Sequence, residues 1–171
     1  MGLLIFAYRK QDIIRRKSDL ELQLMKMKER LFDLHSYSSS ISDGSVSLND
    51  LMKAPASMFN RMSMFMMYSH QGAMAGAQEK YNFMSMTPGA MPQMQNPQMQ
   101  QQYSQMLFKN LYDQEREKFK KVEENVLNEQ DKQISQKSET IQAELKMLEA
   151  ELTSTREAED KAAKDSAPKY A

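Results

Sequence analysis

The stretch LNEQDKQISQKSETIQAELKMLEAEL, residues 127–152, decides the fold. Apolar residues recur in it every seven positions, and two more follow the last two of these by four positions. Such a repeat places its members on one face of an α-helix and is typical of a coiled-coil seam. We therefore predict a helix that packs against another helix through the interface residues Leu127, Ile134, Ile141, Leu145, Leu148 and Leu152.

This helix is expected to extend well beyond the repeat. Residues 103–164 contain neither Pro nor Gly and are rich in Glu, Lys, Gln and Ala, all of which favour helix. The polar residues 165–171 are expected to form a disordered tail. The seam is imperfect, because Asp131 and Ser138 occupy seam positions. An upstream stripe is out of frame with Leu127 and predicts a stutter near residues 126–127; it consists of Leu111, Glu115, Phe119, Val122 and Val126.

A second seam lies near the amino terminus. Its apolar residues are spaced by four and three positions in turn, which predicts a shorter amphipathic helix over residues 1–36. The same frame extends back through Lys17, Ile13, Lys10 and Phe6, where the two lysines weaken it. The serines of residues 35–45 and the pair Asp43-Gly44 are expected to end the helix. The predicted interface residues are Leu20, Leu24, Met27, Leu31 and Leu34.

Charge and methionine divide the chain into three regions. Lys and Arg against Asp and Glu number 8 against 5 in residues 1–35, 3 against 3 in 36–106 and 12 against 15 in 107–171. The net charges of the two flanks are therefore opposite, which is compatible with pairing of the two predicted helices, within one chain or between chains. Of the 17 methionines, 13 lie between Met52 and Met106.

The middle region is expected to hold short helices and then a linker. Over residues 37–84 we predict one helix after Ser47, a break at Pro55, a second helix capped by Ser57 and a marginal piece at 77–84. Residues 85–102, with three prolines among Gln, Asn and Met, are typical of a low-complexity linker. The second helix carries an apolar face that either packs in a core or binds helices of other proteins: Met58, Phe59, Met62, Phe65 and Met66.

The first residues place an apolar tip before a basic cluster. A secretory signal has the opposite order, and a membrane-spanning helix needs roughly 20 apolar residues, so neither fits. Two interpretations stay open: the tip lies in a membrane interface and attracts anionic headgroups, or it begins the seam of the following helix. The residues concerned are Leu3, Leu4, Ile5, Phe6, Arg9, Lys10, Arg15, Arg16 and Lys17.

Signatures of chemistry are missing from the sequence. The chain has no Cys, and its two histidines, His35 and His70, stand apart from any second ligand or triad partner. No phosphate-binding glycine loop or hydrolase motif is present. We therefore expect no catalytic residue, no metal site, no cofactor and no small-molecule substrate. A net charge of zero and the lack of an aromatic stacking platform disfavour nucleic acid as a partner.

Taken together, these patterns predict an all-α protein with a long carboxy-terminal helix, a shorter amino-terminal helix, short Met-rich helices and a linker. The function that they favour is a non-enzymatic coiled-coil scaffold or self-associating structural or interaction protein, with a second copy or another helical protein as partner. A peripheral membrane adaptor is one alternative. Helices at both ends of a variable middle also resemble, in outline, bacterial export-apparatus filament proteins, which implies a secreted filament or translocator-like subunit. The cytoplasm is the expected location, with membrane-peripheral or non-classically exported forms left open.

Overall fold

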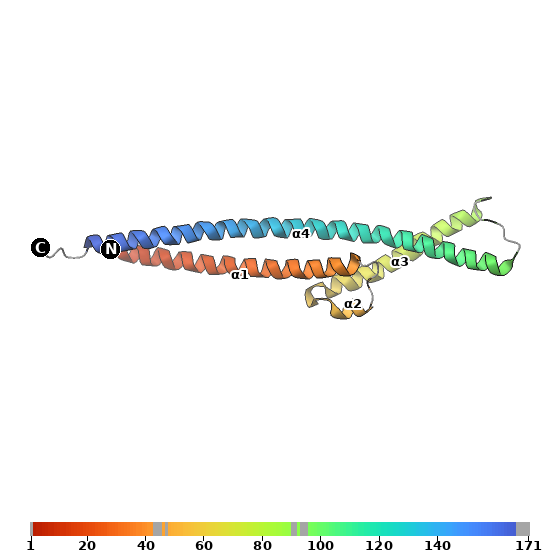
Figure 1. Cartoon of the computed structure of the whole chain (residues 1–171), viewed down its shortest axis with the longest axis horizontal. Helices are drawn as coiled ribbons and strands as arrows, with labels where there is room; N and C mark the ends of the chain where they lie inside the picture. The colour runs from red at the N-terminus through yellow and green to blue at the C-terminus, as the bar shows by residue number, and fades with distance from the viewer. Residues whose placement is uncertain (1, 43–45, 47, 90–91, 93–95, 167–171) are drawn as a thin grey trace. The chain divides into compact units, whose positions relative to one another are not determined.

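The protein is all-α. The computed structural model describes residues 2–42, 46, 48–89, 92 and 96–166, and over these residues it contains four helices and no strand. Figure 1 shows their order along the chain. They are α1 (Gly2–Ser42), α2 (Leu48–Lys53), α3 (Ala56–Met86) and α4 (Pro97–Ser166). The predicted fold class, with a long carboxy-terminal helix and a shorter amino-terminal one, is confirmed.

Helix α1 continues through the serines that were expected to end it. It runs to Ser42, and the Ser40 hydroxyl donates a hydrogen bond of 3.1 Å to the Ser36 carbonyl one turn earlier. Tyr37 and Ile41 are fully buried on this extension, so tertiary packing outweighs the weak helix propensity of serine. The predicted turn at Asp43-Gly44 and the predicted cap at Ser47 lie outside the described residues.

Helix α3 is one continuous helix of 31 residues rather than two short pieces. Pro55 precedes it with an extended ψ of 141°, and the backbone carbonyl of Pro55 accepts the first helical hydrogen bonds. The Ser57 hydroxyl, predicted to cap this helix, instead hydrogen-bonds the Asp33 carboxylate of α1. At the other end, the Thr87 backbone N–H donates to the Phe83 and Met84 carbonyls.

Helix α4 starts inside the predicted linker. The Asn96 side chain accepts a hydrogen bond of 2.9 Å from the Gln98 backbone N–H, as an N-cap does. Pro97 is then the first helical residue, where the missing N–H of proline costs nothing and its fixed φ favours the helix. Pro97 therefore begins the helix, whereas the sequence pattern placed it inside a linker. The predicted disordered tail is helical as far as Ser166, and its remaining residues lie outside the described part.

The described residues fall into two compact units. The two-helix unit is formed by Met1–Phe32 and Asp131–Ala171. It therefore contains most of α1 and the second half of α4. The four-helix unit is Asp33–Gln130, with the end of α1, all of α2 and α3, and the first half of α4.

Candidate interaction surfaces

In the two-helix unit, α1 and α4 run antiparallel and side by side (Figure 1). The ion pairs of Lys10 and Lys17 fix the direction, because Lys17 lies after Lys10 in α1 whereas its partner Glu149 lies before Glu159 in α4. Three ion pairs lie between the two helices of this unit. They join Lys10 Nζ to Glu159 Oε2 at 2.9 Å, Arg9 Nη2 to Glu151 Oε1 at 2.6 Å, and Lys17 Nζ to Glu149 Oε1 at 2.8 Å. The hydrogen bond from Lys17 holds the pKa of the Glu149 carboxyl below its ordinary value, and the same bond raises the pKa of Lys17.

The predicted seams occupy the least exposed positions of both helices in this unit, but they are only partly covered. Among the described residues of this unit, the buried apolar side chains are Ile13 and Ile141. The remaining predicted interface residues of the unit are half-buried: Leu20, Leu24, Met27, Leu31, Ile134, Leu145, Leu148 and Leu152. Apolar seam surface therefore stays accessible along the two-helix unit.

The last two predicted interface residues, Leu34 and Leu127, lie in the four-helix unit and are fully buried there. The upstream stripe of α4 also lies in this unit, and it does not follow the predicted frame. Val122 and Val126 are exposed, and the inward row advances in steps of four from Leu111 to Leu127. A row in steps of four drifts around the helix relative to a heptad seam, because 3.6 residues make one turn.

A stripe of small residues on α3 forms the close contact with α4 in the four-helix unit. Ser69, Ala73 and Ala77 are buried, and Gly72 and Gly76 lie between them. A Cβ atom at Gly72 would collide with the Phe119 ring, and one at Gly76 would lie 3.0 Å from Glu115 Cγ. This stripe was not among the predicted contacts, although small residues spaced by three and four positions in 69–77 are its signal.

Aromatic and charged side chains flank this stripe. Edge-to-face ring pairs join Tyr68 to Phe119 at 5.2 Å between centroids and Tyr81 to Phe108 at 6.1 Å, so α3 and α4 run antiparallel here. The buried Glu115 carboxylate accepts hydrogen bonds from Lys118, at 2.8 Å, and is ion-paired with Lys80. These two ammonium groups hold the pKa of Glu115 below its ordinary value.

A polar network ties α1, α3 and α4 together in the same unit. The Tyr37 hydroxyl donates to Glu123 Oε1 at 3.1 Å, and Arg61 Nε donates to the same oxygen at 2.7 Å. The Arg61 guanidinium also lies 5.6 Å from the Tyr37 ring centroid and binds the Gln130 side chain. Burial, reinforced by the Glu123 charge, raises the pKa of Tyr37. This network is structural, since each of its polar groups is bound to another.

The predicted apolar face of α3 is turned largely inward. Met62 is 1% exposed, Met58, Phe65 and Met66 are half-buried, and Phe59 alone of the five is exposed. A different row is exposed along α3, with steps of three, four, three and four residues. It contains Met64, Met67, Gln71, Met74 and Gln78, and we call it the α3 outer row.

The amino-terminal tip is split between two faces of α1. Leu4, Ile5 and Tyr8 are exposed, at 78%, 66% and 76%, whereas Phe6 is half-buried on the seam side. The Leu3 side chain lies outside the described part of the chain. Of the basic residues, Arg9, Lys10 and Lys17 bind carboxylates of α4, Arg16 pairs with Asp12 at 2.9 Å, and Arg15 is exposed.

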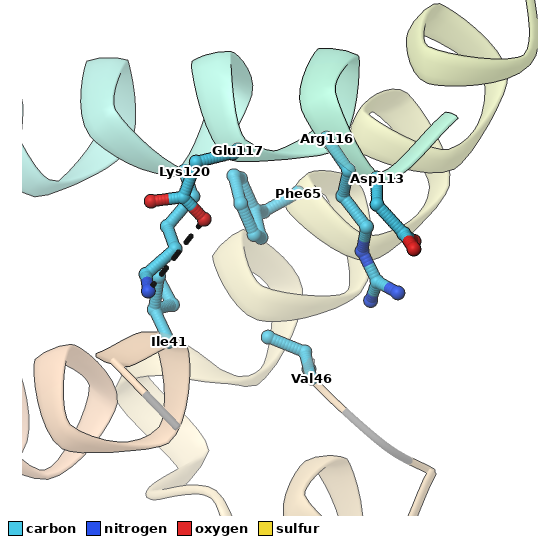
Figure 2. Close-up of a pocket in the computed structure, with 7 residues that line it drawn as sticks. All are labelled: Ile41, Val46, Phe65, Asp113, Arg116, Glu117 and Lys120. Carbon is cyan, nitrogen blue, oxygen red and sulfur yellow. Dashed lines mark ion pairs between the residues drawn. The ribbon is translucent and has the colours of Figure 1, made fainter. Parts of the chain in front are cut away.

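A small cavity of about 170 Å³ opens between α1, α3 and α4 in the four-helix unit (Figure 2). Ile41, Val46 and Phe65 form its apolar side. Its polar side comes from α4 and holds two cations and two anions, Arg116, Lys120, Asp113 and Glu117, with Lys120 and Glu117 3.9 Å apart. The balanced charge offers no preference for a charged ligand.

Among the described residues, no three His, Cys, Asp or Glu side chains gather to hold a metal ion. His70 Nδ1 lies 2.9 Å from the Tyr112 hydroxyl. Over the same described residues, none of the helices combines the length and apolarity needed to cross a membrane.

No protein-family model matches the chain, and no curated protein or solved structure proved similar to it.

Proposed function

We propose that the protein is a non-enzymatic helical scaffold that binds a helix of a second copy or of another protein. The α3 outer row is the observation that carries this proposal. Its three methionines are exposed, and its spacing of three and four residues is that of a helix seam with no partner among the described residues.

The chemistry of the row suits a helix as partner. Residues 62–78 carry no Asp, Glu, Lys or Arg, so no fixed charge has to be desolvated when the row is covered. Thioether side chains adapt to irregular apolar surfaces, and an amphipathic helix lying in such a row buries apolar side chains at the same spacing. Exposed apolar side chains gathered on one face are typical of interaction surfaces, and the three methionines of the row support the proposal in this way.

Light scattering after size exclusion, at two concentrations of the full chain, tests the proposal. We expect a mass above that of the monomer that rises with concentration. Replacing Met64, Met67 and Met74 together by Gln should lower this mass, because it removes the apolar surface while leaving charge unchanged. Met86→Gln, on an exposed methionine outside the row, is the matched control. An unchanged mass in the triple variant would refute the outer row as the binding surface.

A membrane surface is a second candidate, favoured by the exposed tip of Leu4, Ile5 and Tyr8. Three large apolar side chains in the first two turns of a helix can enter the headgroup region, and the exposed Arg15 lies two turns farther along. We expect sedimentation with vesicles of anionic phospholipid that Leu4→Asp abolishes. Leu22→Asp, on an exposed leucine away from the tip, should retain binding. Equal binding by both variants would exclude the tip.

A further inference from the structure

The exposed side of α3 is arranged symmetrically about its own centre. Asn60 is exposed and lies four residues before Met64, so it continues the α3 outer row toward the start of the helix. The positions then advance in steps of four, three, four, three and four, a pattern that reads the same in both directions. A half-turn about an axis across the helix, at the level of Ser69, therefore exchanges them in pairs. It exchanges Met64 with Met74, Met67 with Gln71, and Asn60 with Gln78.

The exchanged side chains are chemically matched. When two such rows face each other across this axis, thioether meets thioether and carboxamide meets carboxamide at the outer positions, and Met67 covers Gln71 at the centre. The two Gln71 side chains then lie near the axis, where each can bind the other, because a carboxamide carries both a donor and an acceptor. Gln78 Nε2 donates to Asn82 Oδ1 at 2.9 Å, which leaves Gln78 Oε1 to accept from Asn60 of the facing row. The row is therefore complementary to itself.

Charge favours an antiparallel second copy on the same surface. The stretch 62–78 carries no charged residue, so two copies meet along it without like-charge repulsion. Arg61 and Glu79 bound this stretch and lie on the same side of α3, because they are 18 residues, about five helical turns, apart. Glu79 is exposed. Arg61 binds Glu123 through Nε and Gln130 through Nη1, which leaves Nη2 to a further acceptor.

An antiparallel copy brings its Glu79 end to the Arg61 end of the first copy, and this happens twice by symmetry. The positive end of each helix dipole likewise meets the negative end of the other. A parallel copy would gather both arginines at one end and both glutamates at the other. A helix of another protein would have to carry this pattern of thioethers, carboxamides and end charges, whereas a second copy carries it already.

We infer that the partner of the α3 outer row is the same row of a second copy, docked antiparallel about the level of Ser69. The contact runs over residues 60–78, a length of about 27 Å. It covers Met64, Met67 and Met74, which are 68%, 58% and 42% exposed in the single chain. Because both copies use the same surface, the contact closes as a dimer. This inference rests on the proposed function, which it deepens by naming the partner, the direction and the register.

Disulfide trapping on the full chain tests the pairing, because the sequence has no cysteine and an introduced one is the sole thiol. Met64→Cys and Met74→Cys are oxidised with glutathione disulfide, each alone and as an equimolar mixture. Antiparallel docking sets position 64 of one copy against position 74 of the other, so the mixture should give about tenfold more cross-linked dimer than either variant alone. In either variant alone the two thiols lie about 15 Å apart along the helices, beyond the reach of a disulfide. Met86→Cys, on an exposed methionine outside the row, should stay at background when mixed with Met64→Cys.

The outcomes separate this inference from the proposed function. Cross-linking of each variant alone to the extent of the mixture would mean parallel pairing and would overturn the antiparallel contact. A multimer whose mixture stays at background would overturn it too. A wild-type chain that is monomeric at both concentrations would overturn the second copy as partner, while the proposed function would continue with a helix of another protein. The outer row itself fails separately, when the triple methionine-to-glutamine variant keeps the mass of a multimeric wild type.

Discussion

The contact between α3 and α4 predicts a specific sensitivity at Ala73. This residue is 0% exposed and lies on the small-residue stripe, between Gly72 and Gly76 in the helix. The space around it is filled, because a Cβ atom at Gly72 would already collide with Phe119 and one at Gly76 would reach Glu115. Ala73→Leu adds three carbon atoms where the two helices approach most closely, and the helices must separate to admit them.

The cost follows from the lack of space. Extra carbons in a filled interior cost typically 1–3 kcal/mol, and we expect about 3 kcal/mol of unfolding free energy to be lost here. For a chain of this size that corresponds to a fall in Tm of about 6–12 °C. Helix propensity contributes little to this change, because Leu is nearly as good a helix former as Ala.

Thermal unfolding followed by circular dichroism at 222 nm measures the effect. The matched control is Ala75→Leu, which makes the same change two residues along α3 at an exposed position. We expect the control to change the unfolding free energy by no more than about 0.5 kcal/mol. Equal melting temperatures for the two variants would refute the close approach of α3 and α4, since both substitutions would then face solvent.

Three further predictions concern two buried residues of the four-helix unit and one ion-paired carboxylate in each unit. Leu127→Ala, at a residue 1% exposed, should cost about 2–5 kcal/mol of unfolding free energy in urea titration. Tyr37→Phe should cost about 1 kcal/mol by removing the hydroxyl bond to α4, whereas Tyr68→Phe, on an exposed ring, should be neutral. The fold holds the pKa of Glu115 and Glu149 below 4.5, so the unfolded chain takes up protons first on acidification. Unfolding free energy measured against pH should therefore be level near neutrality and decrease below about pH 5; a level profile down to pH 3 would contradict both ion pairs.

The parts of the fold that sequence predicts well are those that a local period encodes. The row from Leu20 to Leu34 and the row from Leu127 to Leu152 lie on the least exposed faces of α1 and α4, because a spacing of three and four residues fixes a face whatever packs against it. The helix ends were harder to predict. Ser36–Ser42 and Pro97 carry weak or negative helix signals, and burial of Tyr37 and the Asn96 cap outweigh them.

The sequence predicts that α3 carries an apolar contact surface, but its methionines do not show which face of the helix that surface occupies. Methionines occur on both of its faces, so composition alone does not tell which face meets α4. The small residues decide it: a backbone approaches another helix most closely where side chains are shortest, and Gly72 and Gly76 define that side. Once this side is assigned, Met62 turns inward, and Met64 and Met67 turn outward. Small residues at helical spacing in 69–77 therefore indicate, in the sequence itself, which side of α3 faces α4.

The seam lysines, which appeared to weaken the α1 seam, specify its partner. Two α1 helices paired in parallel would bring Lys10 against Lys10 and Lys17 against Lys17, and like charges at a seam are unfavourable. Against α4, the same ammonium groups reach Glu159 and Glu149 at 2.9 and 2.8 Å. Glu159 follows Leu152 by seven residues, so it extends the α4 seam itself. The lysines therefore favour α1–α4 pairing over α1–α1 pairing.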